Sequence, residues 1–210
     1  MRSVRSVYRQ MSEEMPQLRR ACRRSGYSGR GLRILHSLRE ETDTEHSFQV
    51  AYDAQALALI TNHLGGEQVD IGDVLAMALY HDLSETVTGD MPTPVKYFRP
   101  EMRALYGGLE QSAKNRLLAT LPEELRAAYA PVVDPDESTL AWKLVKSADR
   151  ISAYLKCAEE TKSGNNEFRR AMEGKLAELS ASDLPAVQYF MENIVPVYMR
   201  SLDELELPKE

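Results

Sequence analysis

Cysteine, histidine and long apolar runs are all scarce in this chain of 210 residues. Its two cysteines cannot build the disulfide framework of a small secreted protein, so we expect a reducing, cytoplasmic setting. The longest uninterrupted apolar run is the segment Val74 to Tyr80, far shorter than the roughly 20 residues that cross a bilayer. No apolar segment of a secretory signal follows the arginine-rich start. The sequence therefore predicts no membrane partner.

Acidic and basic residues are unevenly distributed. The first 33 residues contain nine Arg and two Glu, whereas the remaining 177 contain 17 basic and 30 acidic side chains. An acidic body lacks the basic face that releases counterions from a phosphate backbone, so we expect no nucleic-acid polymer as a partner. Residues 1–30 are expected to form a basic helical extension, which is either solvated, in contact with nucleic acid, or the source of a phosphate-binding arginine for a pocket. Residues 31–210 are long enough to bury the core of a single domain.

Apolar residues recur at helical spacing through most of the chain, and no strand pair with hairpin chemistry is present. The sequence therefore predicts an all-α fold. Two prolines forbid regular structure in a loop at 89–94, and Pro196 is expected to kink the last helix. We expect helices over 3–24, 44–64, 71–88, 99–119, 123–129, 136–162, 166–180 and 183–203.

Three acid–base side chains follow the apolar run directly: His81, Asp82 and Glu85. On a continuous helix, neighbouring residues lie about 100° apart, and a residue three or four positions later lies on the same side. Charge placed straight after a buried run needs a partner, because unpaired charge in a core is very costly. A metal ion, an internal ion pair or a position at a helix end would each supply one.

Two further residues widen the pattern. His46 lies in the first turn of the helix expected at 44–64, and Asp149 lies in the middle of the helix expected at 136–162. A salt bridge with Lys146 or Arg150 would also explain Asp149 without any function. Two imidazoles and two carboxylates together suit Mn²⁺, Co²⁺, Fe²⁺ or Zn²⁺, with coordination positions left for water and a substrate oxygen.

In this combination the sequence resembles the HD-domain phosphohydrolases, and among them the bacterial 5'-deoxynucleotidases of the YfbR type. The resemblance covers about residues 35–205. It is carried by Glu45-His46-Ser47, Gln49-Val50, Tyr80-His81-Asp82, Ser84-Glu85, Thr88-Gly89-Asp90, Pro92 to Phe98, Leu144-Val145-Lys146, Ala148-Asp149, Ala153 to Cys157 and Gly164 to Phe168.

The resemblance implies an all-helical HD-domain bundle with a central metal site. It implies hydrolysis of 2'-deoxynucleoside 5'-monophosphates to deoxynucleoside and phosphate, by a homodimer. The divalent cation would be Co²⁺ or Mn²⁺, with Fe²⁺, Zn²⁺ or Mg²⁺ as alternatives. By matching motifs, the metal ligands are His46, His81, Asp82 and Asp149, the catalytic residue is Glu85, and the substrate-binding residues are Asp82, Asp90, Met91, Pro92 and Thr93.

The chain departs from the family at one point. Enzymes of this type have an Arg-Trp pair shortly before the first metal-binding histidine, whereas this chain reads Gly-Arg-Gly-Leu-Arg at 29–33, and its one tryptophan is Trp142. Arg30 or Arg33 is expected to replace the arginine, since a guanidinium binds phosphate through two hydrogen bonds. This departure keeps one alternative open, the hydrolysis of another nucleotide such as a deoxynucleoside triphosphate. A second alternative is a non-catalytic nucleotide-binding HD module, against which the complete ligand set and Glu85 argue.

Overall fold

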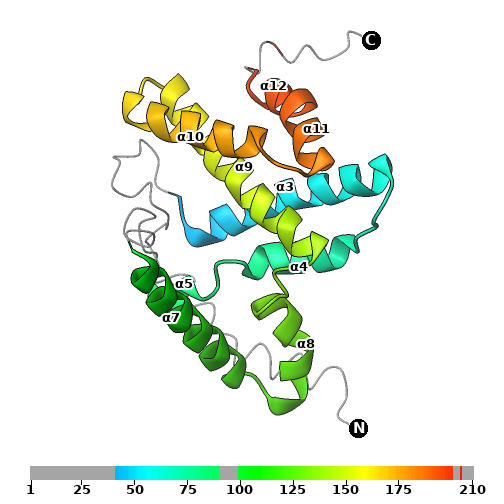
Figure 1. Ribbon diagram of the computed structural model, residues 1–210, viewed down its shortest axis with the longest axis vertical. Helices are drawn as coiled ribbons and strands as arrows, with labels where there is room; N and C mark the ends of the chain where they lie inside the picture. Colours follow the sequence, from blue (N-terminus) through cyan, green and yellow to red (C-terminus); the bar gives the residue numbers. More distant parts are fainter. Residues whose placement is uncertain (1–40, 90–98, 201–203, 205–210) are drawn as a thin grey trace. The chain divides into compact units, whose positions relative to one another are not determined.

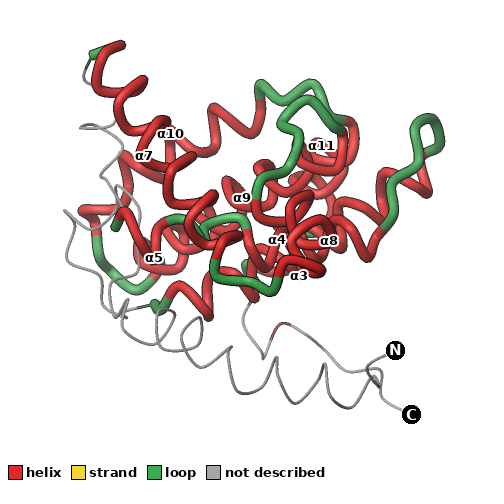
Figure 2. The backbone as a smooth tube through the Cα atoms, turned by 90° about the horizontal axis from the view of Figure 1, so that it is seen from below, coloured by secondary structure: helices red, strands yellow, loops and turns green. Residues whose placement is uncertain are grey.

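The computed structural model describes residues 41–89, 99–200 and 204, and these consist of helices and loops without any strand (Figure 2). The expected all-α fold is confirmed over these ranges. None of their helices is both long and apolar enough to cross a membrane. The helix expected at 3–24 and all of the loop expected at 89–94 except Gly89 fall outside the described residues.

The described chain divides into two compact units. The first contains residues 41–47 and Tyr80–Asp134, and the second contains Phe48–Leu79 and the described residues from Pro135 onward. Each unit is considered by itself, and the single domain expected over 31–210 stays a prediction. The helices, labelled in Figure 1, are α3 (Asp43–Leu64), α4 (Ile71–Tyr80), α5 (Glu85–Thr88), α7 (Pro100–Ala119), α8 (Glu123–Val133), α9 (Leu140–Lys162), the 3₁₀-helix η1 (Asn166–Phe168), α10 (Arg169–Ser180), α11 (Pro185–Asn193) and α12 (Val195–Tyr198).

The expectation of one continuous helix over 71–88 is wrong. Helix α4 ends at Tyr80, and the chain then makes tight turns in which the Leu83 amide donates to the Tyr80 carbonyl at 3.0 Å and the Glu85 amide donates to the Asp82 carbonyl at 2.9 Å. Bonds to the third residue back replace bonds to the fourth, which narrows the coil. The break falls where the apolar run gives way to polar side chains.

Other helix boundaries also differ from the expected ones, and α8 continues to Val133 rather than ending at 129. Helix α9 begins at Leu140 rather than near Asp136, because Asp136 Oδ1 accepts a hydrogen bond from the Ser138 amide (2.9 Å) in a turn before the helix. The Thr139 hydroxyl then caps α9 by accepting from the Trp142 amide at 3.2 Å. The last expected helix is divided into α11 and α12 next to Pro196, whose ring cannot continue an existing helix.

The second unit has a continuous apolar core. Helix α9 contributes the most buried residues and packs along α10 (Figure 1). Burial of one large apolar side chain stabilises a fold by about 1.5–3 kcal/mol. The large residues of this core include Val50 and Leu57 of α3, Val74 of α4, Leu144, Val145 and Ile151 of α9, Leu179 of α10, and Val187 and Phe190 of α11. A buried thiol, Cys157, lies in the same helix α9, and burial raises its pKa to about 11.

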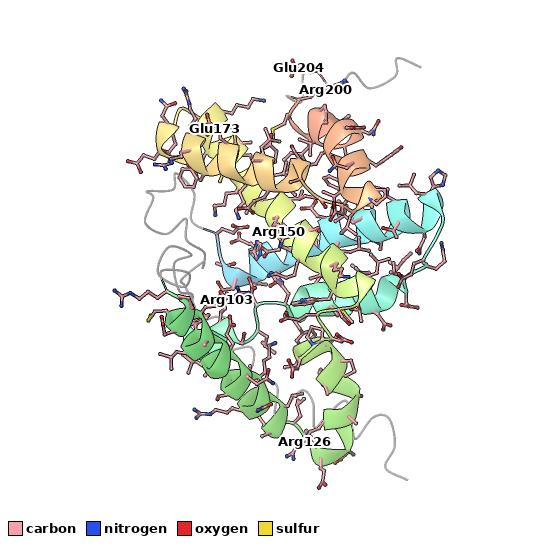
Figure 3. The ribbon with its side chains drawn as sticks, in the orientation of Figure 1. Arg103, Arg126, Arg150, Glu173, Arg200 and Glu204 are labelled. Atoms are coloured by element: carbon pink, nitrogen blue, oxygen red, sulfur yellow. The ribbon has the colours of Figure 1, made fainter. Side chains whose placement is uncertain are left out.

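The first unit is held together by α7. This helix packs against α5 and α8 and buries Tyr106, Ala113 and Leu117. At the far end of α8, Asp134 accepts hydrogen bonds from Gln111 (2.7 Å) and Lys114 (3.0 Å). Partial burial opposes ionisation of Asp134, but these two hydrogen bonds and the Lys114 charge outweigh it and hold the pKa below its usual value. Arg126, labelled in Figure 3, closes the turn between α7 and α8 by donating to the carbonyls of residues 119 and 121.

One acidic side chain in the second unit is half-buried among apolar residues. Asp53 lies on α3 between Val50 and Leu57, which are fully buried and on the same helix face. Burial raises the pKa of Asp53 from 3.8 to about 7. Because the folded state binds this proton more tightly than the unfolded state, ionisation of Asp53 lowers the free energy of unfolding as the pH rises from about 4 to about 7.

We therefore expect Asp53→Asn to stabilise the metal-free protein at pH 8 by several degrees in melting temperature, with a much smaller gain at pH 4.5. The amide keeps the size of the carboxyl group and removes the buried charge. Thermal unfolding at both pH values measures the effect, with Glu67→Gln as a control at an exposed acid. Equal gains at the two pH values would contradict a raised pKa at Asp53.

Candidate metal centre and active site

The first turn of α3 is fixed by a reciprocal cap. The Thr42 amide and hydroxyl both donate to Glu45 Oε2, at 2.8 and 2.9 Å, and the Glu45 amide donates back to the Thr42 hydroxyl at 3.2 Å. This is the capping-box arrangement, which satisfies amides that have no partner inside the helix. The next residue is His46, whose amide donates to the Thr42 carbonyl at 3.0 Å. The cap therefore sets the direction in which the His46 imidazole leaves the helix.

The turn after α4 brings His81 and Asp82 to that imidazole. The Nε2 atoms of His46 and His81 lie 3.3 Å apart. Asp82 Oδ2 lies 3.0 Å from His81 Nε2 and 3.7 Å from His46 Nε2. The His81 side chain is fully buried, and that of His46 is only 4% exposed. Two nitrogens and one oxygen from distant parts of the sequence thus converge on one point within the first unit.

This convergence fits a divalent metal ion. Bonds of about 2.0–2.2 Å from an ion to His nitrogen and Asp oxygen place neighbouring ligand atoms about 3.0–3.6 Å apart, which is close to the spacing seen here. Two imidazole nitrogens that face each other without an ion must share one proton, because one of them has to act as acceptor. Imidazole and carboxylate ligands together suit ions such as Mn²⁺, Fe²⁺, Co²⁺ and Zn²⁺.

Glu85 is tied to the same turn. It is the first residue of α5, and its amide donates to the carbonyl of Asp82 at 2.9 Å. Its side chain is half-buried. The backbone of Glu85 therefore lies close to that of Asp82, as expected, although a turn rather than a continuous helix places it there.

The end of α5 is anchored to α7. Gly89 has a φ of 70°, a conformation that favours glycine, and its amide donates to the Glu85 carbonyl at 2.9 Å. The buried Tyr106 hydroxyl donates to the Gly89 carbonyl at 3.0 Å and lies 3.5 Å from the Thr88 hydroxyl. This anchor fixes the point from which the chain continues toward residue 90.

Asp149 belongs to the second unit, on α9, where Lys146 donates to its Oδ2 at 2.9 Å. Of the two cations that the sequence offered as partners, Lys146 makes this ion pair, while Arg150, labelled in Figure 3, is exposed. The remaining expected substrate residues, Arg30, Arg33, Asp90, Met91, Pro92 and Thr93, lie outside the described residues.

Sequence reasoning missed two residues that support His46. One is Thr42, which the Thr-x-x-Glu pattern at 42–45 signals as a capping box. The other is Glu41, whose Oε1 lies 3.9 Å from His46 Nδ1, the ring nitrogen that faces away from the cluster. A carboxylate on that side favours the tautomer in which Nε2 carries the lone pair. No spacing rule signals Glu41, because its position depends on the entry of the chain into α3.

An all-helical fold with a His-His-Asp cluster at its site is that of an HD-domain phosphohydrolase. A solved HD-domain phosphohydrolase from Listeria innocua superposes with a TM-score of 0.68 at 28% identity, over 78% of this chain and 79% of that one. A protein from Pyrococcus horikoshii shares the fold, with a TM-score of 0.61 at 24% identity, over 87% of this chain and 98% of that one.

The chain belongs to the 5'-deoxynucleotidase YfbR-like family, whose model matches residues 32–198. The 5'-deoxynucleotidase YfbR of Escherichia coli is 44% identical over 82% of this chain and 87% of the relative. A 5'-deoxynucleotidase of Shewanella oneidensis is 42% identical over 82% of this chain and 89% of the relative. The family expected from the sequence is thereby confirmed.

Removal of the cap is expected to destabilise the metal-binding end of α3. Thr42→Ala deletes the hydroxyl that pairs with Glu45, and loss of such a cap costs about 1 kcal/mol of stability. Thr61→Ala is the matched control on the same helix, because the Thr61 hydroxyl donates within the helix to the Leu57 carbonyl and caps nothing. Urea unfolding of both variants measures the difference. Equal losses would show that the cap contributes nothing special.

Proposed function

We propose that this protein hydrolyses 2'-deoxynucleoside 5'-monophosphates to deoxynucleoside and phosphate, with a divalent cation held by His46, His81, Asp82 and Asp149. The observation that supports this most directly is the meeting of two histidine nitrogens and the Asp82 carboxylate within 3.7 Å of one another. The relatives from Escherichia coli and Shewanella oneidensis carry the name 5'-deoxynucleotidase, and they align with more than four-fifths of this chain.

The donor set determines what the site contributes. A divalent cation in such a site lowers the pKa of a water ligand and polarises a phosphoryl oxygen. His46 and His81 would hold the ion through their Nε2 atoms, and Asp82 would hold it through a carboxylate oxygen. Asp149 is the fourth ligand of the proposal, since its Ala-Asp motif matches the family.

Glu85 moves the proton in this mechanism. The oxygen of the attacking water forms a bond to phosphorus, and the bond from phosphorus to the 5' oxygen of the nucleotide breaks. Glu85 takes the proton from the water and returns it to the 5' oxygen as that oxygen leaves. The hydrogen bond from its amide to the Asp82 carbonyl keeps Glu85 next to the proposed ligand Asp82.

We assign substrate recognition to Asp82, to the residues that follow Gly89 in the sequence, and to an arginine that precedes His46 in the sequence. Asp82, Asp90, Met91, Pro92 and Thr93 would contact the nucleotide, and the two prolines at 92 and 94 limit the entropy lost on binding. Arg30 or Arg33 would bind the phosphate. Residues 90–93 follow Gly89 directly in the sequence, and the Tyr106 anchor on Gly89 supports this role.

Three finer points belong to the same proposal. The cation is Co²⁺ or Mn²⁺, because mixed imidazole and carboxylate ligands with open positions suit these ions. The active form is a homodimer, as in the family that the sequence resembles, and light scattering would measure its mass. The protein works in the cytoplasm, because that compartment keeps a thiol such as the one of Cys157 reduced and contains the nucleotide substrate.

A panel of nucleotides tests the reaction. We expect the Co²⁺-loaded or Mn²⁺-loaded protein to release inorganic phosphate from dAMP and the other deoxynucleoside monophosphates, and none of the products of triphosphate cleavage from dATP. Phosphate, pyrophosphate and triphosphate are measured separately. Consumption of dATP without consumption of dAMP would show that the protein is a triphosphohydrolase and that the proposal is wrong. The altered Arg-Trp site is the feature of the sequence that favours this alternative.

The role of Glu85 is tested apart from metal binding. We expect Glu85→Ala to bind the cation as wild type does and to lose turnover by at least 100-fold, since general acid–base catalysis contributes about 10²–10⁴ in rate. Calorimetric titration with Mn²⁺ and phosphate release measure the two properties. Glu101→Ala, at an exposed acid in the first turn of α7, is the control and should change neither. Unchanged turnover in Glu85→Ala would remove this residue from the mechanism.

A further inference from the structure

Lys146 is held by two side chains of its own helix. Its ammonium donates to Asp149 Oδ2 at 2.9 Å and lies 5.8 Å from the centre of the Trp142 ring. These residues are three positions after and four positions before Lys146, so all three lie along one stripe of α9. A cation above an indole ring is attracted to its face. Trp142 therefore restricts the positions that the long Lys146 side chain adopts.

The surroundings of this pair differ from those of an ordinary surface pair. Val145 and Ala148, which flank Lys146 and Asp149 in the sequence, are fully buried, and the Asp149 side chain is only 19% exposed. On α10, Lys175 and Glu178 form a pair with the same spacing and the same 2.9 Å distance, but the Glu178 side chain is 52% exposed. The Lys175–Glu178 pair therefore matches the Lys146–Asp149 pair in spacing and distance, but its carboxylate is much more exposed to solvent.

A carboxylate that binds a metal ion has to be held in one orientation. It has two oxygens with about four lone-pair positions, so an ammonium at one oxygen leaves room for an ion on the same group. Partners of ligating carboxylates orient them, and loss of such a partner typically costs 10–100-fold in metal affinity. An ammonium that is itself restrained by an aromatic ring is well suited to that task.

We propose that Lys146, restrained by Trp142, is the positioning residue that orients the Asp149 carboxylate for the metal ion. The inference rests on the proposed function, in which Asp149 is a metal ligand. It adds a chain of contacts along α9 from Trp142 through Lys146 to Asp149 that tunes affinity for the cation. Lys146 itself touches neither the ion nor the reacting atoms in this role.

Binding of Co²⁺ to the full-length protein tests the role directly. We expect Lys146→Met to weaken Co²⁺ binding by about 10-fold or more in competition with a chelator. The visible absorption bands of the bound Co²⁺ should also change, because they report the ligand geometry. Lys146→Arg should recover most of the affinity, since a guanidinium keeps the charge and the hydrogen bond to Asp149. Lys175→Met, which removes the matched pair on α10, should leave affinity and spectrum as in wild type.

The outcomes separate this role from the metal site itself. If Lys146→Met binds Co²⁺ as tightly as wild type or more tightly, with the same spectrum, while Asp149→Ala binds weakly, the positioning role is wrong and the ligand assignment stands. If Asp149→Ala binds Co²⁺ like wild type, the ligand assignment fails and the positioning role fails with it. Far-UV circular dichroism of the metal-free variants confirms folding, and Trp142→Leu serves as a second variant, expected to weaken binding by a smaller factor.

Discussion

The arrangement of the first unit depends on the meeting of two buried imidazole nitrogens and one carboxylate oxygen. His46 and His81 present Nε2 atoms to each other at 3.3 Å, next to Asp82 Oδ2. Burial of these polar groups is costly unless each of them has a partner. A divalent cation bound to all three would supply that partner. The capping box at Thr42 and the tight turn after Tyr80 are the backbone features that make the meeting possible.

The break after α4 shows how local and tertiary demands compete. Helical spacing alone would continue the helix to Thr88, with His81 and Asp82 about 100° apart around its axis. The chain instead leaves the helix after Tyr80, and in the turns that follow, the side chains of His81 and Asp82 lie close to His46 and the Glu85 amide donates to the Asp82 carbonyl. The sequence therefore indicates the neighbouring His and Asp, whereas the turn that presents them depends on tertiary packing.

Helix α9 has two roles in the second unit. One face carries Leu144, Val145 and Ile151 into the core, which gives the helix its rigidity. Another stripe carries Trp142, Lys146 and Asp149, polar or aromatic groups that contact one another. A ligand on such a helix is held more precisely than a ligand on a loop, because packing fixes the backbone beneath it. Asp53 on α3 shows the cost of placing a carboxyl group among apolar side chains, because burial raises its pKa.

The sequence by itself determined the helical class, most helix positions, the family and the residue types of the site. These follow from apolar spacing, from turn residues and from short motifs such as His-Asp, which are local properties of the chain. Only the tertiary structure decided that α4 stops at Tyr80, that Glu41 stands behind His46, that Lys146 rather than Arg150 pairs with Asp149, and that burial shifts the pKa of Asp53. Each of these depends on what lies nearby in space and on how much water is excluded, and neither is a property of sequence spacing.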